Sequence, residues 1–252
     1  ARPVAGTAAL AGGEDGGGSY HSIYDSFDHY TRFGDPEFAY GIALAQTAGR
    51  AVLRAADSDV LPFEFLNFAD TVGKYIKEVA KLADDLRDET QRHNQSIRER
   101  WFEAVADPTQ TYVVPKPKPE VPHLNFAPLQ NALAGLRESA RKYDATMAQQ
   151  KKRGATLSLE TQKSLDQILL KSERALARDA GLPRRPWYKH QIYAPGFYTG
   201  YGVKTLPGVR EAIEERNWPE FAEQTEIVSQ TIVRFATEID RATAVVRRAL
   251  SD

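Results

Sequence analysis

Apolar residues recur at intervals of three and four along most of this chain after residue 35, which is the pattern of amphipathic helices. The first such stretch follows Asp35-Pro36-Glu37, where Asp35 is expected to cap a helix and Pro36 to take its first position. The expected apolar face of this helix consists of Phe38, Ile42, Ala45, Gly49, Val52 and Ala56. Leu61-Pro62 breaks the periodicity and ends the stretch.

A second helix is predicted to start near Phe63 or Glu64, with a narrow apolar seam of the kind that packs helix on helix. The seam residues are Ala69, Val72, Ile76, Val79, Ala83 and Leu86. Beyond Arg87 the sequence is polar all round as far as Gln95, so we expect either an exposed continuation or a break there. The proline-rich run 115–119 then predicts an extended connector.

A third helix is predicted from Phe126 to Gly154, and a fourth after Ser158 that is stopped by Gly181 and the prolines following it. Trp218-Pro219 opens the final helix. The third and final seams are unbroken, with Phe126, Leu129, Leu133, Leu136, Ala140, Tyr143 and Met147 in one and Phe221, Thr225, Val228, Ile232, Phe235, Ile239, Ala242, Val246 and Ala249 in the other. Four long helices with matching seams predict a mainly α fold built as a left-handed bundle.

The helical pattern stops between the fourth and final helices, where residues 187–202 are rich in aromatic residues and glycine and show no helical period. Pro207 is expected to open a short helix after this loop. The loop is either an ordered connection that fills a hollow at the end of the bundle or a functional segment. Long loops inside compact domains are enriched for function, so both readings stay open on the residues alone.

Composition is ordinary for a globular protein, with 42% hydrophobic and 27% charged residues among 252, which is long enough for a sizeable core. The formal net charge of −1 gives no reason to expect nucleic acid or an anionic membrane as a partner. No apolar run approaches the length needed to span a bilayer. Because cysteine is absent, disulfides and thiolate metal sites are excluded.

Near the start of the chain, the glycines of residues 16–18 are followed by Tyr20 and His21, with hydroxyls and carboxylates close behind. Glycine allows a chain to approach a site closely, and a neutral histidine is the commonest side-chain metal ligand. A histidine in such a place is more often an ordinary, partly buried side chain, so this motif alone is a weak signal for a metal site.

Several runs together resemble the family of zinc peptidases that includes glutamate carboxypeptidase II and the transferrin receptor. The runs are residues 16–25 with Asp28, Phe33-Gly34-Asp35-Pro36, Val60-Leu61-Pro62-Phe63, residues 182–195 and Leu206-Pro207-Gly208. The resemblance implies that residues 1–59 are the C-terminal segment of an α/β catalytic domain. Residues 60–252 would then form a four-helix-bundle-like, transferrin receptor-like dimerisation domain.

The resemblance also implies a role for individual residues. His21 matches the last of the family's zinc ligands, and Tyr20 matches a tyrosine whose hydroxyl supports the tetrahedral intermediate. In the family, a loop of the helical domain uses a Lys-Tyr pair to grip the carboxylate of a C-terminal glutamate. Tyr201 matches the tyrosine, whereas Gly200 stands at the lysine position. The loss of this cation argues against a preference for acidic C-terminal residues.

The chain lacks most of what such an active site needs, namely another histidine, two aspartates and a glutamate as ligands, and a further glutamate as general base. The other histidines, His29, His93, His123 and His190, do not have the spacing of a helical zinc pair. The resemblance implies that the whole enzyme holds two zinc ions. The isolated chain is expected to bind zinc poorly and to be catalytically silent.

The expected partners are a second copy of the chain through the helical domain, the upstream catalytic domain and, in the whole enzyme, a peptide substrate. The resemblance suggests a secreted, periplasmic or extracellular-facing location. The alternative is a non-catalytic interaction module, as in the transferrin receptor branch of the family. The presence of Tyr20 and His21 favours the peptidase.

Overall fold

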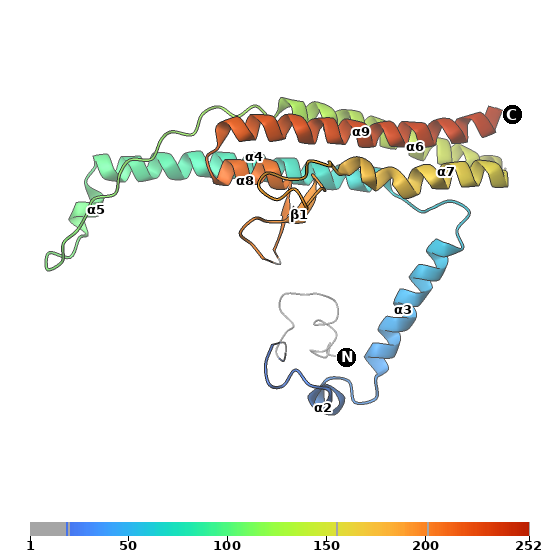
Figure 1. Ribbon diagram of the computed structural model, residues 1–252, viewed down its shortest axis with the longest axis horizontal. Coiled ribbons are helices and arrows are strands. Elements are labelled where there is room, and N and C mark those ends of the chain that lie inside the picture. The colour runs from blue at the N-terminus through green and yellow to red at the C-terminus, as the bar shows by residue number, and fades with distance from the viewer. Residues whose placement is uncertain (1–18, 20, 155, 201, 252) are drawn as a thin grey trace. The chain divides into compact units, whose positions relative to one another are not determined.

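The computed structural model describes residues 19, 21–154, 156–200 and 202–251 (Figure 1). The chain divides into two compact units, residues 1–62 and residues 63–252, and each is described by itself. In the described part of the first unit, a one-turn helix α2 (Phe27–His29) runs into a π-helical turn (Tyr30–Gly34), and helix α3 (Ala39–Ala56) follows.

Helix α3 begins three residues later than the sequence predicts. Its N-cap residue is Phe38, which has a left-handed backbone conformation with φ 56°, and Pro36 lies outside the helix. The prediction that Asp35 occupies the N-cap position is therefore wrong. Its carboxylate nevertheless accepts hydrogen bonds from the backbone N–H groups of Tyr40 (3.3 Å) and Gly41 (2.8 Å), so it still satisfies the first turn of α3.

Asp35 also accepts a hydrogen bond from the hydroxyl of Tyr30 (3.2 Å). Burial raises the pKa of the Asp35 carboxyl, but these three hydrogen bonds outweigh that effect and hold its pKa below the ordinary value. The same contact acts on its partner, because burial and the hydrogen bond to the carboxylate raise the pKa of Tyr30.

None of the residues of α3 is buried, although the helix has the predicted amphipathic pattern. Ile42 is 52% exposed and Val52 is 66% exposed. Amphipathic helices of this length owe most of their stability to the packing of their apolar face.

The second unit is a bundle of helices that lie side by side (Figure 1). Its four long helices are α4 (Phe65–Arg98), α6 (Ala127–Arg153), α7 (Leu159–Ser172) and α9 (Trp218–Ser251). Helices α6 and α9 make the most extensive contact, while α4 packs on α6 and α7 packs on α9. The predicted mainly α fold is confirmed.

The core of the bundle consists of the seam residues that the sequence places on facing helices. In α6 and α9 the residues with little or no exposed surface include Leu129, Leu136, Ala140, Val228, Ile232, Ile239 and Val246. Phe65 joins three helices, because its ring lies edge-to-face against Tyr143 of α6 (5.1 Å between centroids) and Phe235 of α9 (5.8 Å).

Helix ends follow local sequence where capping residues are present. Gly154 ends α6 with a left-handed conformation (φ 63°), and the hydroxyl of Ser158 accepts the Thr161 N–H (3.2 Å) at the start of α7. Helix α7 continues only as a 3₁₀ turn (Glu173–Leu176), so it stops before the predicted breaker. Residues 176–178 instead exchange backbone hydrogen bonds with residues 189–191, which takes them out of the helix.

The polar run after residue 87 continues α4 to Arg98 without a break, and helix α5 (Trp101–Ala104) follows. The proline-rich connector has no helix or strand and is held against α4. The side-chain amide of Asn94 donates to the carbonyl of Lys118 and accepts its N–H, both at 2.8 Å. Lys118 also pairs with Glu89 (2.8 Å), and this contact lowers the pKa of the Glu89 carboxyl.

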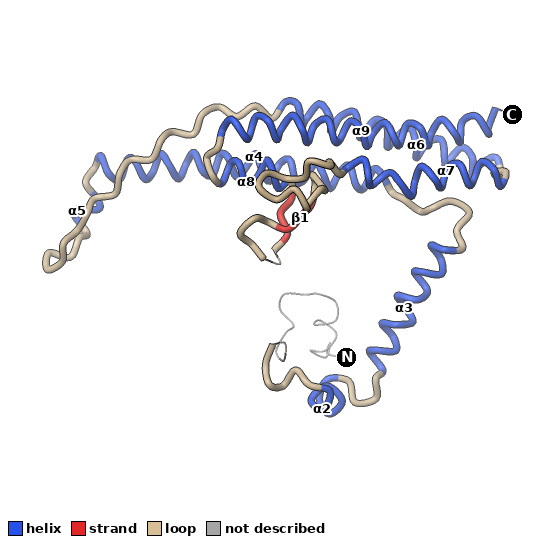
Figure 2. Tube along the Cα trace, viewed as in Figure 1, coloured by secondary structure: helices blue, strands red, loops and turns tan. Residues whose placement is uncertain are grey.

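The aromatic and glycine-rich loop contains a small hairpin that the sequence does not predict. Strand β1 (Tyr193–Pro195) pairs antiparallel with β2 (Val203–Thr205), shown in red beside the bundle in Figure 2. Helix α8 (Pro207–Glu214) follows directly, with the predicted proline at its start. In the part of the chain that the structure describes, no helix is long and apolar enough to cross a membrane.

Candidate functional site

The tip of the hairpin is a tight loop between the paired ends of β1 and β2. The N–H of Gly196 donates to the carbonyl of Gly202 (3.1 Å), and the N–H of Gly202 donates to the carbonyl of Thr199 (2.9 Å). A β-carbon on Gly196 would lie 2.4 Å from Oγ1 of Thr199, so any other residue there would force the side chains of Thr199 and Lys204 to shift. The strands are three residues long, and hairpins this short are marginal without outside support.

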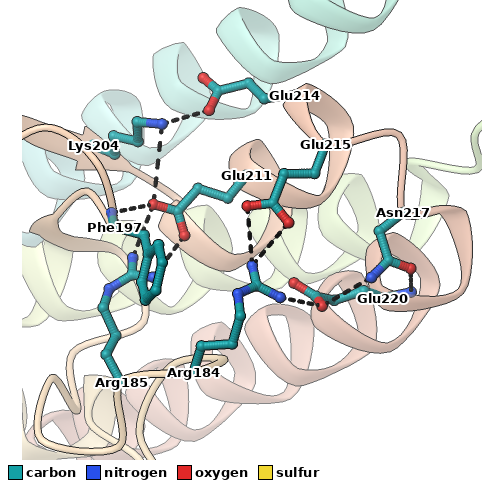
Figure 3. Close-up of polar contacts among 9 residues, drawn as sticks. All are labelled: Arg184, Arg185, Phe197, Lys204, Glu211, Glu214, Glu215, Asn217 and Glu220. Atoms are coloured by element: carbon teal, nitrogen blue, oxygen red, sulfur yellow. Dashed lines mark hydrogen bonds and ion pairs between the residues drawn. The ribbon is translucent and has the colours of Figure 1, made fainter.

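That support is a buried ion pair beneath the hairpin (Figure 3). Arg185 donates from Nη1 to Oε2 of Glu211 (2.7 Å) and from Nη2 to Oε1 (3.0 Å), and the two side chains are 2% and 3% exposed. Oε1 of Glu211 also accepts the backbone N–H of Phe197 (2.8 Å), and Nη2 of Arg185 donates to the carbonyl of Pro195 (3.3 Å). The pair therefore binds the chain on both sides of Gly196.

Further charges surround this pair at the rim of the site. Lys204 of β2 lies with Nζ 4.0 Å from Oε1 of Glu211 and forms an ion pair with Glu214 (Figure 3). Arg184 pairs with Glu215 (3.1 Å) and Glu220 (2.8 Å). The hydrogen bond to Glu220 is the main cause that raises the pKa of the Arg184 guanidinium.

The two aromatic side chains Phe197 and Tyr198 of the tip lie in different environments. The ring of Phe197 lies against two guanidinium groups, with Arg184 at 5.6 Å and Arg185 at 5.8 Å from its centroid, which is the geometry of a cation–π contact. Tyr198 is 79% exposed. Phe197 is thus used to hold the base of the loop, and Tyr198 is the aromatic side chain that the described part of the tip offers outward.

Of the two predicted substrate-contact residues, Gly200 is described and Tyr201 lies outside the described residues. Gly200 has a left-handed backbone conformation (φ 56°), and no atom lies within 4 Å of the position that a β-carbon would take. Space is therefore available at this position, but any other side chain would carry the strain of a positive φ.

The predicted zinc ligand His21 lies in a turn of the first unit, is exposed and has φ 58°. Tyr20, the predicted catalytic tyrosine, lies outside the described residues. Among the described residues, no group of three or more His, Asp or Glu side chains is placed to hold a metal ion. The described residues therefore do not form a metal site by themselves.

Arg185 and Glu211 are site residues that the sequence reasoning missed. Glu211 lies among the buried residues of α8, next to Ala212 and Ile213. A carboxylate on the apolar face of a short helix is a usable signal, since buried charges are normally paired. Its partner cannot be found from spacing, because Arg185 lies 26 residues earlier in an irregular loop.

Comparison with known proteins identifies this fold. Residues 124–240, from just before α6 into α9, match the family model of the transferrin receptor-like dimerisation domain. The part of the bundle from α6 into α9, together with the hairpin, is thus similar to this class of domain.

Curated relatives extend the match over nearly the whole chain. The chain is 30% identical over 231 residues to "Probable glutamate carboxypeptidase LAMP1" of Arabidopsis thaliana, which covers 92% of the chain and 28% of that protein. It is 27% identical over 233 residues to "Probable glutamate carboxypeptidase" of Arthroderma benhamiae (90% and 27%), and 25% identical over 218 residues to "Aminopeptidase NAALADL1" of mouse (83% and 24%). The chain spans about a quarter of the length of these relatives. It belongs to the glutamate carboxypeptidase and transferrin receptor-like family.

Proposed function

We propose that this chain is the C-terminal part of a zinc-dependent exopeptidase similar to glutamate carboxypeptidase II. In this proposal residues 1–59 end the catalytic domain, and residues 60–252 form the dimerisation domain that also lends its hairpin to the substrate pocket. The observation that carries it is the 92% coverage of the chain in an alignment with a relative named as a carboxypeptidase. Relatives named as carboxypeptidases and as an aminopeptidase favour a peptidase over the non-catalytic alternative.

The exposed apolar face of α3 supports the assignment of the first unit to a larger domain. This helix is 18 residues long and buries none of them. A helix with an apolar stripe that faces solvent is poorly stable by itself, so its apolar side chains are expected to pack on the rest of the catalytic domain in the whole protein.

The contribution of this chain to the chemistry is limited to a few side chains. His21 would provide one imidazole ligand, and a zinc ion held by the whole site would act as a Lewis acid toward water and the scissile carbonyl. The phenol of Tyr20 would donate a hydrogen bond to the negative charge that develops on the scissile carbonyl oxygen. Since the described residues do not form a metal site by themselves, the remaining ligands and the general base must come from elsewhere in the whole protein.

The hairpin tip would contact the substrate. Tyr201 would donate a hydrogen bond to the carboxylate at the substrate's end, as the family resemblance implies. Gly200 brings no cation, and the outward aromatic side chain of the described tip is Tyr198. The proposed pocket therefore accepts neutral or apolar residues rather than selecting a C-terminal glutamate.

Two copies of the chain would pair through the helical domain. The name of the matching family model supports this part of the proposal, because it describes a dimerisation domain. A two-fold symmetric dimer is the commonest arrangement for such a pair.

Zinc and peptidase assays on the full-length protein test the proposal. We expect the wild type to hold zinc and to hydrolyse peptides, and His21→Ala to lose both. His29→Ala is the matched control, because this nearby histidine is not a proposed ligand and its loss is expected to leave zinc content unchanged. A full-length protein without zinc or peptidase activity would instead favour the non-catalytic alternative. The isolated 252-residue chain is expected to have no peptidase activity and to lose zinc on dialysis.

A further inference from the structure

We infer that Glu211 is a positioning residue that determines how tightly the hairpin tip binds substrate. It does so through Phe197 and Arg185, without touching the substrate itself. This inference rests on the proposed function, in which the tip contacts the substrate, and it goes beyond the roles that the resemblance gives to Tyr201 and Gly200.

The first argument is that the Glu211 carboxylate and its partner Arg185 bind the backbone at the base of the tip. Oε1 of Glu211 accepts the N–H of Phe197 at 2.8 Å, and the bound Arg185 donates to the carbonyl of Pro195 at 3.3 Å. These two backbone groups flank Gly196, where the tip begins. A shift of the Glu211 carboxylate therefore moves the first residues of the tip directly.

The second argument is that the tip has few contacts of its own to define its shape. The turn bonds between Gly196, Thr199 and Gly202 close the loop, and the exposed ring of Tyr198 lies edge-to-face on Phe197 (4.7 Å) within the tip itself. The two strands have only three paired positions. The buried pair under Gly196 thus attaches the backbone on both sides of Gly196 to α8.

The third argument concerns burial. A buried ion pair gives little net stability, because the loss of hydration of both charges offsets their attraction. In this pair the cost is higher still, since the Nε atom of Arg185 is buried without a hydrogen-bond partner among the residues described. A pair that adds little net stability to the domain as a whole, yet holds two backbone groups of the hairpin, is best explained by a need for a defined geometry there.

The test compares Glu211→Gln with Glu214→Gln in the full-length protein. Both changes remove one charge from α8 and one contact with Lys204, but Glu214 touches neither Phe197 nor Arg185. For Glu211→Gln we expect the KM of the best peptide substrate to rise about tenfold while kcat changes less than about threefold, the pattern for a lost binding contribution. For Glu214→Gln we expect KM within about twofold of the wild type.

A second variant covers the case in which Glu211→Gln does not fold. The double change Arg185→Met and Glu211→Leu replaces the buried charges with apolar side chains of similar size, which is commonly tolerated. It leaves the Phe197 N–H without its carboxylate acceptor. We expect normal zinc content and a KM raised at least as much as in the single variant.

Hydrogen exchange of the full-length variants gives a readout that does not depend on activity. We expect the amides of residues 196–199 to exchange faster in the double variant and to be unchanged in Glu214→Gln. A folded double variant with wild-type KM and wild-type exchange overturns the inference and leaves the proposed function intact. A full-length wild type without peptidase activity overturns both.

Discussion

Replacing Phe65 with alanine is expected to destabilise the helical bundle severely. This residue begins α4, is 4% exposed and lies edge-to-face against Tyr143 of α6 and Phe235 of α9. Its ring is therefore shared by three helices that meet at one level of the bundle. Removal leaves a cavity that rigid neighbouring helices fill only in part.

The expected loss is about 3–5 kcal/mol, the range for a buried phenylalanine changed to alanine. Two edge-to-face ring contacts, each contributing about 0.5–1.5 kcal/mol beyond area burial, place Phe65 toward the upper part of that range. In a unit of this size, each kcal/mol lowers Tm by about 2–4 °C, so we expect a fall of about 10 °C or more.

Urea denaturation of the 252-residue chain, followed by helical circular dichroism, measures this loss. Phe63→Ala is the matched control, because Phe63 lies two residues away, 6.0 Å from the Phe65 ring, and is 45% exposed. We expect it to cost no more than about 1 kcal/mol. Equal losses for the two variants, or a loss below about 1 kcal/mol for Phe65→Ala, would refute the reasoning from packing.

Three further outcomes are expected. The full-length protein should hydrolyse peptides with C-terminal Leu or Gln at least as well as those with Glu, because a charge-assisted contact that Gly200 cannot make would contribute about ten- to a hundredfold. Light scattering should show a homodimer at tens of micromolar, as proposed for the helical domain. Stability should fall as pH is lowered below the ordinary histidine pKa, because burial lowers the pKa of His190 in the folded chain, so the unfolded chain binds more protons there. His190→Gln should make this fall smaller.

Each of these outcomes has a result that contradicts it. A strong preference for C-terminal Glu over Leu would contradict the specificity derived from Gly200, unless a basic residue from elsewhere in the protein replaces the missing lysine. A monomer at the same concentration, with or without the upstream part, would count against pairing through the helical domain. An unchanged pH dependence in His190→Gln would mean that the imidazole does not couple folding to protonation, although its Nδ1 accepts the N–H of Tyr193 at 3.1 Å.

Helices of the second unit could be predicted because the signals that define them are local. The apolar seams fall on the faces that the structure buries, Gly154 and Ser158 cap the helices where the sequence places them, and Pro207 and Trp218 begin theirs. Backbone preferences and side-chain caps act within one or two turns, so each is visible in a short stretch of sequence.

Predictions failed where a longer-range contact competed with a local preference. Aspartate is a preferred N-cap residue, yet Phe38 takes the N-cap position of α3. Asp35 lies before the helix, and its carboxylate accepts hydrogen bonds from the N–H groups of Tyr40 and Gly41 in the first turn. Helix α7 ends early because residues near Leu176 pair with residues near His190. The hairpin likewise depends on pairing between strands too short to show a period of two.

The sequence by itself determined that this is a mainly α chain, where its long helices lie and which faces of them are apolar, and the family resemblance followed from runs of residues. Only the tertiary structure decided which charges meet beneath the hairpin. Arg185 and Glu211 are 26 residues apart, and neither has a spacing or a neighbour that marks the other. Burial explains this pairing. A charge removed from water needs an opposite charge and hydrogen bonds, and the tertiary structure decides which residues can supply them.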